Sequence, residues 1–413
     1  MPRGKAAVTG ELSEIEDAGL LRRLRRLSTA QGPRVMLEGE VVLMLCSNDY
    51  LGLADHPKVR KAAARAAMTQ GAGSGSSRLV AGNHDFHEEL EFELSRFKQV
   101  ESALIFGSGY LANTGTIAAI AGVEPGGVVF SDELNHASII DGCRLAEAET
   151  FVYRHCDLDH LAWGLRKAGD RARLIVTDSL FSMDGNLAPL PGIVDLAERH
   201  DVMTMVDEAH ATGCFGPEGR GAIAHLGMSG KVDLVVGTLG KALGSYGAFV
   251  GCSSDLRDYL INRARPFIFS TAPPPPSIAA AAKALDLVRA KPGRLERLER
   301  NSRILRDSLR ELGVPTGNSS SQIIPVIVGD ATAASRLCDR LLSQGIYAQA
   351  IRPPTVPEGT SRLRMSVMSE HKSSELREAA RLVSRAVQDL GIDIQRPAEI
   401  SAGSKRDMLE QAA

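Results

Sequence analysis

The chain has 413 residues, of which 44% are hydrophobic and 24% charged, and its formal net charge at pH 7 is −2. This composition is typical of a globular protein with two or three domains and excludes disordered and fibrous classes. The small net charge and the 4% aromatic content argue against nucleic-acid and membrane partners. Six cysteines without CxxC spacing predict reduced thiols and no metal site, and the absence of an apolar leader favours a cytoplasmic protein.

The N-terminal segment over residues 1–50 is expected to be helical or extended. Within it, residues 11–27 predict a helix with a basic end, formed by Arg22, Arg23, Arg25 and Arg26. A run of basic residues on a helix is usually a solvated face, so this one is not interpreted as a nucleic-acid site.

A regular alternation of short apolar runs and helical stretches begins near residue 100. Continuous apolar runs are typical of strands buried on both faces, and their alternation with helices predicts a mainly parallel sheet in an α/β domain. The seven predicted strands are Ala103–Phe106, Val128–Phe130, Thr150–Tyr153, Leu174–Thr177, Met203–Val206, Leu234–Val236 and Ala248–Gly251.

The pattern changes at the proline tract Pro273–Pro276, which neither a helix nor a strand can continue. Two helices are predicted beyond it, over 277–289 and 295–312. Strands over 322–328, 346–350 and 362–368 then indicate a smaller α+β unit. We therefore expect a large domain over 51–290, a small C-terminal domain over 291–395 and a disordered tail over 396–413.

Polar residues follow several predicted strands, where an open parallel sheet binds its ligands. The first strand is followed by Gly107-Ser108-Gly109-Tyr110-Leu111-Ala112, a GxGxxA pattern at the start of a helix. With Asp132 at the end of the next strand, this pattern fits a dinucleotide, another phosphate group or a plain tight turn. The motif by itself does not decide among the three.

Other strand ends carry His136, Ser182, Asp207 with Glu208 and His210, and Lys241. Asp207 and Glu208 point apart if they continue a strand, which favours one acid facing one cation over a metal cluster. A partly buried lysine is a good amine nucleophile or base. An anion-binding glycine loop, a buried acid, a stackable histidine and a lysine together fit pyridoxal 5′-phosphate.

The sequence resembles the α-oxoamine synthases, which are fold-type I pyridoxal-phosphate enzymes, over about residues 20–390. The resemblance rests on six motifs: Ser47-Asn48-Asp49-Tyr50-Leu51-Gly52-Leu53, Gly73-Ser74-Gly75-Ser76-Ser77-Arg78, Asn135-His136-Ala137-Ser138, Phe181-Ser182-Met183-Asp184-Gly185, Asp207-Glu208-Ala209-His210 and Thr238-Leu239-Gly240-Lys241. It implies a large domain with a mainly parallel seven-stranded sheet, a smaller α+β domain, and a homodimer with its active site at the subunit interface.

The same resemblance implies a role for each matching residue. Lys241 would carry the cofactor as a Schiff base, Asp207 would pair with the pyridine nitrogen, and His136 would stack on the ring and assist at the thioester. The implied cofactor-binding residues are Gly109, Tyr110, His136, Ser182, Asp207, His210, Thr238, Lys241 and Thr271. The implied substrate-binding residues are Arg22, Asn48, His136, Thr355 and Arg364, with Arg364 on the amino-acid carboxylate.

The segment Ile351–Pro357 resembles the subgroup that makes 8-amino-7-oxononanoate in biotin biosynthesis. That subgroup condenses L-alanine with a pimeloyl thioester of coenzyme A or acyl carrier protein and releases carbon dioxide and thiol. Because Thr238–Gly244 has a form also seen in glycine C-acetyltransferases, an α-oxoamine synthase with another amino acid or acyl thioester is the alternative. A nicotinamide-dependent oxidoreductase and a non-catalytic protein of the same fold are the other hypotheses.

Overall fold

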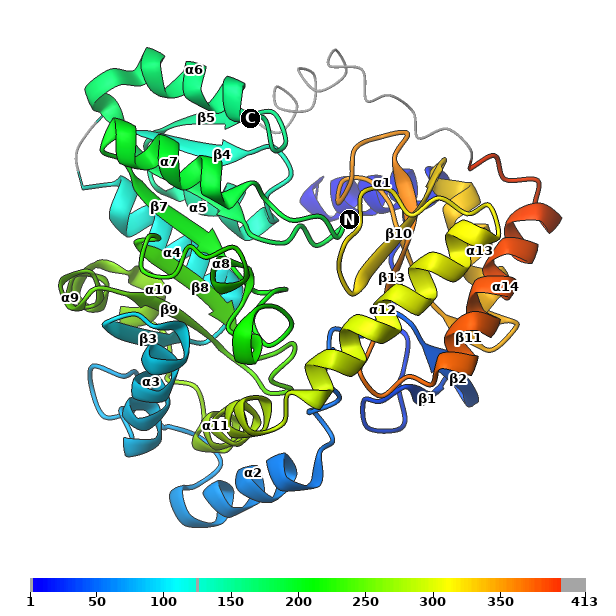
Figure 1. Ribbon diagram of the computed structural model, residues 1–413, viewed down its shortest axis with the longest axis horizontal. Coiled ribbons are helices and arrows are strands. Elements are labelled where there is room, and N and C mark those ends of the chain that lie inside the picture. The colour runs from blue at the N-terminus through cyan, green and yellow to red at the C-terminus, as the bar shows by residue number, and fades with distance from the viewer. Residues whose placement is uncertain (1–2, 124–125, 395–413) are drawn as a thin grey trace. The chain divides into compact units, whose positions relative to one another are not determined.

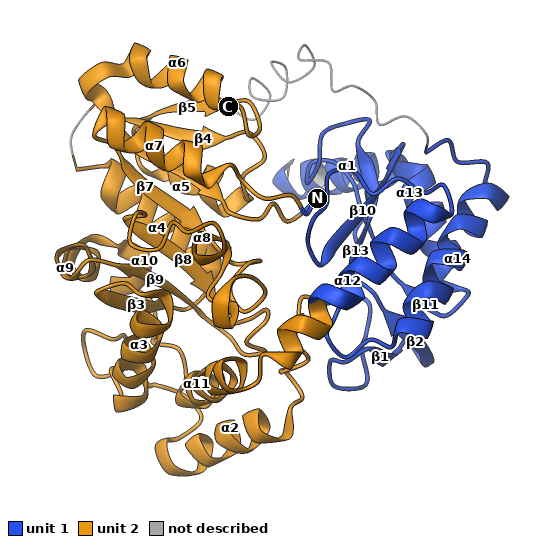
Figure 2. Ribbon diagram, viewed as in Figure 1, with its two compact units in different colours: residues 1–47, 183–185, 299–413 blue, residues 48–182, 186–298 orange. Residues whose placement is uncertain are grey.

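The computed structural model describes residues 3–123 and 126–394 (Figure 1). The tail predicted over 396–413 lies outside these residues. The chain divides into two compact units (Figure 2). Unit 2 contains Asn48–Ser182 and Asn186–Leu298, whereas unit 1 combines the chain up to Ser47 with Met183–Gly185 and the chain from Glu299 onward.

Unit 2 is built on a seven-stranded sheet. Its strands are β3 (Ser102–Phe106), β4 (Val128–Asp132), β5 (Glu149–Tyr153), β6 (Ala172–Asp178), β7 (Met203–Asp207), β8 (Leu234–Thr238) and β9 (Ala248–Cys252). They lie in the order β3-β9-β8-β7-β6-β4-β5, and β9 alone runs antiparallel to its neighbours. All seven predicted strands are therefore confirmed, as is the mainly parallel sheet.

Helices cover both faces of this sheet (Figure 1). The helices of unit 2 are α2 (Pro57–Gln70), α3 (Asp85–Lys98), α4 (Gly109–Ala121), α5 (Ala137–Leu145), α6 (Leu158–Ala168), α7 (Leu190–His200), α8 (Ala222–His225), α9 (Ser254–Arg263), α10 (Arg265–Ile268) and α11 (Pro275–Ala290), of which α2 packs on α11. Successive side chains of a strand point to opposite faces, so in β6 Leu174 and Val176 join the core with α4 and α5. Ile175 joins the opposite core with α6 and α7. This double burial explains the continuous apolar runs.

Unit 1 contains the smaller α+β unit predicted at the C-terminal end of the chain, but the chain up to Ser47 and Met183–Gly185 also belong to it and its C-terminal part begins at Glu299 and not at 291. One sheet has the order β1-β2-β11 and the other β10-β13-β12. The strands are β1 (Arg34–Leu37), β2 (Glu40–Met44), β10 (Ile323–Gly329), β11 (Ile346–Tyr347), β12 (Gln349–Ile351) and β13 (Ser361–Ser366). The helices are α1 (Arg3–Asp17), α12 (Gly293–Glu311), which begins in unit 2, α13 (Ala331–Leu342) and α14 (Ser373–Asp389). The single strand predicted over 346–350 is split, because β11 pairs with β2 whereas β12 pairs with β13.

The predicted helix over 11–27 is wrong in its second half. Helix α1 ends at Asp17, and Gly19 adopts a left-handed φ of 67°, a conformation that commonly terminates helices. The guanidinium of Arg352 then donates hydrogen bonds to the backbone oxygens of Gly19 and Leu21. These tertiary contacts hold an extended segment where the basic residues alone suggested a helix.

Within the part of the chain that the structure describes, no helix is both long and apolar enough to cross a membrane.

Candidate active site

The predicted site residues of unit 2 gather at one edge of the seven-stranded sheet. Strands β4, β6, β7 and β8 are parallel, so their carboxyl ends lie at the same edge. Asp178 ends β6 and lies opposite Asp207, which ends β7. The loop with His136 follows β4, and the turn with Lys241 follows β8.

Lys241 lies in a hydrogen-bonded chain of side chains. Its Nζ is 2.9 Å from His210 Nε2, and His210 Nδ1 is 2.7 Å from the hydroxyl of Tyr50. Tyr50 in turn donates to Asn48 Oδ1 at 3.0 Å. A phenol has one hydrogen to donate, so His210 must donate from Nδ1 to Tyr50. Its Nε2 is then the acceptor that orients the Lys241 amine.

A tight turn fixes the backbone of Lys241. The amide of Gly244 donates to the Lys241 carbonyl at 2.9 Å, and Gly244 has a φ of 59°. A Cβ at Gly244 would lie 2.3 Å from the backbone nitrogen of Ala54, so this turn requires glycine. The hydroxyl of Thr238 accepts from the amide of Gly240 and donates to the carbonyl of Gly247. Thr238 thus shapes the lysine turn, in addition to its predicted place near a phosphate.

A second hydrogen-bonded chain joins Asp207 to His136. Asp207 Oδ2 accepts from Asn113 Nδ2 at 2.7 Å, and Asp207 Oδ1 accepts from the amide of Ala209 at 2.7 Å. Asn113 Nδ2 also donates to Ser138 Oγ at 2.9 Å, which lies 2.7 Å from His136 Nδ1. The Asp207 carboxyl group at the end of β7 therefore has a fixed orientation and is linked to His136 through Asn113 and Ser138.

This second chain also sets the protonation of His136. Since Ser138 Oγ accepts from Asn113, its own hydrogen is donated to His136 Nδ1, and the Ser138 amide donates to the same nitrogen at 3.2 Å. Burial of the ring lowers the pKa of His136 below its usual value. The charge of Lys241 also lowers this pKa, whereas the charge of Asp207 raises it, and the net shift is downward. His136 is therefore neutral near pH 7, with its proton on Nε2.

Asp178 and Asp207 form a pair of buried carboxyl groups side by side. Burial raises the pKa of Asp178 well above its usual range, and the neighbouring Asp207 charge raises it further. Asp178 also accepts from the amide of His136 at 2.8 Å, which holds the start of the histidine loop. Asp178 therefore favours its protonated form beside Asp207.

The start of helix α4 offers an anion site at the end of β3. Ser108 caps the helix, with Oγ accepting from the amide of Leu111. The amides of Gly109 and Tyr110 find no acceptor among the described residues, and a Cβ at Gly109 would meet nothing within 4 Å. Open space before two free N–H groups at a helix N-terminus suits a phosphate. The Tyr110 hydroxyl instead donates to Asp141 Oδ2 at 2.6 Å.

These features fit pyridoxal phosphate. A candidate phosphate site, a buried carboxyl group, a neutral histidine and an oriented lysine amine all lie along one sheet edge of unit 2. Glu208, the neighbour of Asp207, points instead into the core to pair with Lys98. Asp207 and Glu208 therefore point apart, as expected from the alternation of side chains along a strand.

Two further predicted residues of unit 2 lie in loops. Ser182 is half-buried in the turn between β6 and α7, where Phe181 donates from its amide to the carbonyl of Asn186. Thr271 is exposed and forms an isolated bridge with Ser77. Their contacts with the cofactor stay predictions.

The remaining predicted residues belong to unit 1. Arg364 is buried on β13, where its Nη1 donates to Ser366 Oγ at 3.0 Å. Thr355 is exposed in the loop after β12, and its amide donates to the carbonyl of Arg352. Arg22 is exposed in the extended segment after α1. The substrate roles of all three stay predictions.

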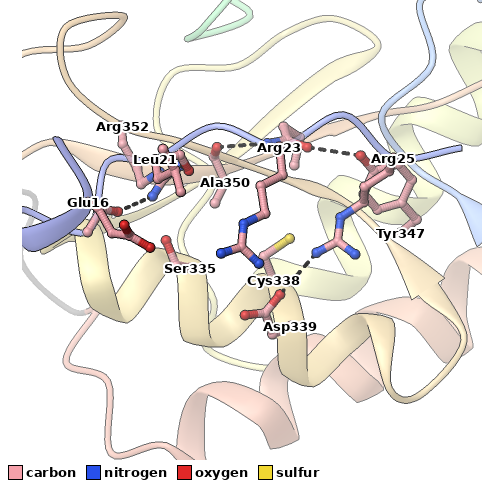
Figure 3. A pocket seen from close by; sticks show the side chains of 12 residues that line it. Glu16, Leu21, Arg23, Arg25, Ser335, Cys338, Asp339, Tyr347, Ala350 and Arg352 are labelled. Carbon is pink, nitrogen blue, oxygen red and sulfur yellow. Dashed lines mark hydrogen bonds and ion pairs between the residues drawn. The ribbon is translucent and has the colours of Figure 1, made fainter. Parts of the chain in front are cut away.

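Unit 1 also contains a cavity of about 410 Å³ between the extended N-terminal segment, α13 and β12 (Figure 3). Arg23, Arg25 and Arg352 contribute to its lining, but Arg25 is paired with Asp339 and Arg352 binds the backbone of the N-terminal segment. None of the predicted site residues lines this cavity.

Reasoning from the sequence missed four residues that organise the site: Tyr50, Asn113, Ser138 and Asp178. Tyr50 and Ser138 lie within recognised motifs without an assigned role. Asn113 follows Gly109 by one helical turn, so it shares the face of α4 that begins at the sheet edge. The end position of Asp178 on a buried strand was the available signal for its pairing with Asp207.

Comparison with known proteins agrees with this geometry. Residues 40–383 match the family described as aminotransferase class I and II. An 8-amino-7-oxononanoate synthase of Geobacter sulfurreducens is 49% identical over 94% of this chain and 99% of its own length. Serine palmitoyltransferase from S. paucimobilis, solved with a bound PLP–myriocin adduct, superposes with a TM-score of 0.88 at 31% identity over 93% of this chain and 98% of that one. The structure of 8-amino-7-oxononanoate synthase from Francisella tularensis superposes with a TM-score of 0.74 and is 28% identical in sequence. The match covers 85% of this chain and 99% of that chain. The chain therefore belongs to the aminotransferase class I and II family and, within it, to the α-oxoamine synthases.

Proposed function

We propose that this protein condenses L-alanine with a pimeloyl thioester to give 8-amino-7-oxononanoate, carbon dioxide and free thiol, a step of biotin biosynthesis. The observation that carries the proposal is the 49% identity, over nearly the full length of both chains, to a relative named for this activity. The chemistry at the sheet edge of unit 2 supports the same reaction.

Pyridoxal phosphate is the cofactor, and the site would offer partners to its aldehyde, pyridine nitrogen, ring face and phosphate, with His210 and Ser182 near the ring hydroxyl. Lys241 would hold the aldehyde carbon, Asp207 the protonated pyridine nitrogen, and the amides of Gly109 and Tyr110 the phosphate. His136 would lie against the ring face. When bound, pyridoxal phosphate supplies an electron sink that accepts the electron pair left after the alanine Cα–H bond breaks. Asp207 keeps that sink effective because its negative charge favours the protonated nitrogen.

Proton transfer at alanine would fall to Lys241. Its free amine, oriented by His210 Nε2, removes the Cα proton and later returns it to the product. The Tyr50–His210 bond keeps the acceptor nitrogen turned toward the lysine. The hydrogen bonds from Tyr50 through His210 to Lys241 therefore orient the lone pair of the lysine amine.

The two substrates would be held by different residues. Arg364 provides a planar guanidinium that can bind the alanine carboxylate through two parallel hydrogen bonds. The Nε2–H of neutral His136 can donate to the thioester carbonyl oxygen, where negative charge develops as the new carbon–carbon bond forms and the thiol leaves. Loss of carbon dioxide then precedes return of the proton. Asn48, Thr355 and Arg22 are proposed contacts of the substrates.

The protein is proposed to act as a homodimer on a coenzyme A or acyl carrier protein thioester. Thr271 is exposed in the single chain, which leaves its hydroxyl accessible to a second copy. Light scattering of the purified protein tests the dimer. A monomer that retains full activity would contradict a shared site.

Turnover tests the function directly. Purified protein with pyridoxal phosphate is given pimeloyl-CoA and either L-alanine or glycine, and the product is identified by its mass. The proposal expects 8-amino-7-oxononanoate from alanine, and loss of both product and lysine-linked cofactor absorbance in Lys241→Ala. Product from glycine alone would assign the chain to an acetyltransferase-like activity instead.

A further inference from the structure

Three side chains with metal-binding atoms converge beyond the carboxyl ends of β4 and β5. They are Asp132, His155 and Cys156, and their donor atoms lie within 4.8 Å of one another. His155 Nδ1 is 2.9 Å from Asp132 Oδ1, and Cys156 Sγ is 3.7 Å from the same nitrogen. In a tetrahedral zinc site, with bonds of about 2.0 Å to nitrogen and oxygen and about 2.3 Å to sulfur, donor atoms lie about 3.3–3.6 Å apart. Small side-chain adjustments would therefore accommodate an ion.

The backbone holds this cluster in place. The amide of Cys156 donates to Asp132 Oδ2 at 2.9 Å, and the amide of His155 donates to Glu133 Oε1 at 3.0 Å. Cys156 has a φ of 57°, a left-handed conformation that is uncommon for a residue other than glycine. The turn after β5 thus imposes an unfavourable backbone geometry that directs the thiol toward His155. Strain of this kind is concentrated at functional positions.

Asn186 provides an independent indication of an absent partner. Its Nδ2 lies 3.0 Å from His155 Nε2 and 3.7 Å from Cys156 Sγ, while its Oδ1 is buried without a hydrogen-bond partner among the described residues. The two ends of a carboxamide have nearly the same shape, so a half-turn of this amide is sterically neutral. It would bring an oxygen ligand to the cluster.

We propose that Asp132, His155 and Cys156 form a zinc site, with Asn186 or a water molecule completing the coordination. A thiolate, an imidazole and a carboxylate are the ligand types that Zn²⁺ uses, whereas Mg²⁺ and Ca²⁺ prefer oxygen ligands alone. On binding, the metal–sulfur bond replaces the S–H bond and the thiol proton passes to solvent. The His155 side chain is 22% exposed, so an ion can enter from solvent.

Spacing along the sequence did not indicate this site. Asp132 ends β4, whereas His155 and Cys156 follow β5, and only the parallel pairing of these strands brings them together. The ligands are none of the residues assigned to the proposed reaction. Failure to bind zinc would therefore leave the proposed reaction unaffected. Failure of the proposed reaction would likewise leave the zinc site unaffected.

The test measures metal binding by the holoenzyme without amino acid. Cobalt(II) replaces zinc as a visible probe, and equilibrium dialysis with Zn²⁺ gives the stoichiometry and affinity. We expect one equivalent bound, cobalt d–d bands typical of tetrahedral coordination, and a sulfur-to-cobalt charge-transfer band. Because removal of even an outer-shell partner lowers metal affinity by about 10–100-fold, Cys156→Ser should weaken binding at least tenfold and abolish the charge-transfer band.

Cys46 gives the matched control, because Cys46 and Cys156 are the two cysteines of the chain that are not buried. Cys46→Ser should bind metal as the unaltered protein does. His155→Gln provides a second ligand variant, and circular dichroism establishes that each variant is folded. Absence of stoichiometric binding, or equal affinity in Cys156→Ser and the unaltered protein, would overturn the proposal.

Discussion

Replacing Lys98 should destabilise the protein strongly, because this lysine neutralises a carboxylate inside the core of unit 2. The Lys98 and Glu208 side chains are 2% and 1% exposed, and Nζ lies 2.6 Å from Glu208 Oε2. Nζ also donates to Thr212 Oγ1 at 2.8 Å and to the carbonyl of Arg220 at 2.6 Å. Glu208 Oε1 accepts from the amide of Ile223 at 2.7 Å. All three lysine hydrogens and both carboxylate oxygens are therefore satisfied.

Lys98→Met would keep much of the side-chain volume but remove the charge and all three donors. Glu208 would keep one backbone donor and lose its counter-ion. Removing one member of a buried ion pair typically costs about 3–5 kcal/mol, because an uncompensated charge remains in the core. We expect a loss of that size in the free energy of unfolding. The double variant Lys98→Met, Glu208→Gln should recover at least half of it, since no buried charge then remains.

Urea denaturation followed by circular dichroism measures these differences, at one fixed concentration of pyridoxal phosphate because a bound cofactor stabilises the native state. Glu208 directly follows Asp207, so the single variant should also bind the cofactor more weakly. A loss below about 1 kcal/mol in Lys98→Met, the size of an ordinary hydrogen bond, would refute the reasoning. Equal stability of the single and double variants would refute it as well.

Three further predictions concern Tyr50, Ser138 and His371. Tyr50→Phe leaves His210 Nδ1 without its hydrogen-bond partner and should lower the free energy of unfolding by about 1–3 kcal/mol in urea denaturation. An unchanged free energy of unfolding would contradict the importance of this buried bond. Ser138→Ala removes the hydroxyl that donates to His136 Nδ1 and should reduce kcat by about 2- to 10-fold, the equivalent of about 0.5–1.5 kcal/mol. Ser138→Thr keeps a hydroxyl and should retain activity. A fully active Ser138→Ala variant would contradict the role assigned to Ser138. Burial lowers the pKa of His371 to about 4, so between about pH 6.5 and pH 4 the unfolded chain binds a proton that the folded chain excludes. The free energy of unfolding should therefore fall by about 3 kcal/mol over this range. His371→Gln should flatten the measured stability–pH curve there, and an unchanged slope would contradict this.

The sheet of unit 2 was predictable because its strands are buried on both faces and therefore read as unbroken apolar runs. The end of α1 was not, because the contacts of Arg352 with the backbone of Gly19 and Leu21 come from more than 300 residues away. The separation of β11 from β12 was also unpredictable, because it depends on pairing with strands far apart in the sequence. Two neighbouring segments join different sheets, and local propensity carries no information about their partners.

The gathering of His136, Asp207 and Lys241 at one sheet edge was predictable from their positions at the ends of parallel strands. The side chains that orient them were not. Asn113 matters because it reaches both Asp207 and Ser138, and Tyr50 because its hydroxyl determines the tautomer of His210. Such roles depend on distances between residues far apart in sequence, which motif spacing does not contain.

The most direct test of the proposed function is competition between the two amino acids. The holoenzyme is given pimeloyl-CoA with equal concentrations of L-alanine and glycine, and the mass of the product is recorded beside that of the Arg364→Ala variant. The account predicts 8-amino-7-oxononanoate as the main product and a higher KM for alanine, with little change for the thioester, in the variant. Product formed mainly from glycine, or no carbon–carbon bond formation with either amino acid, would contradict it.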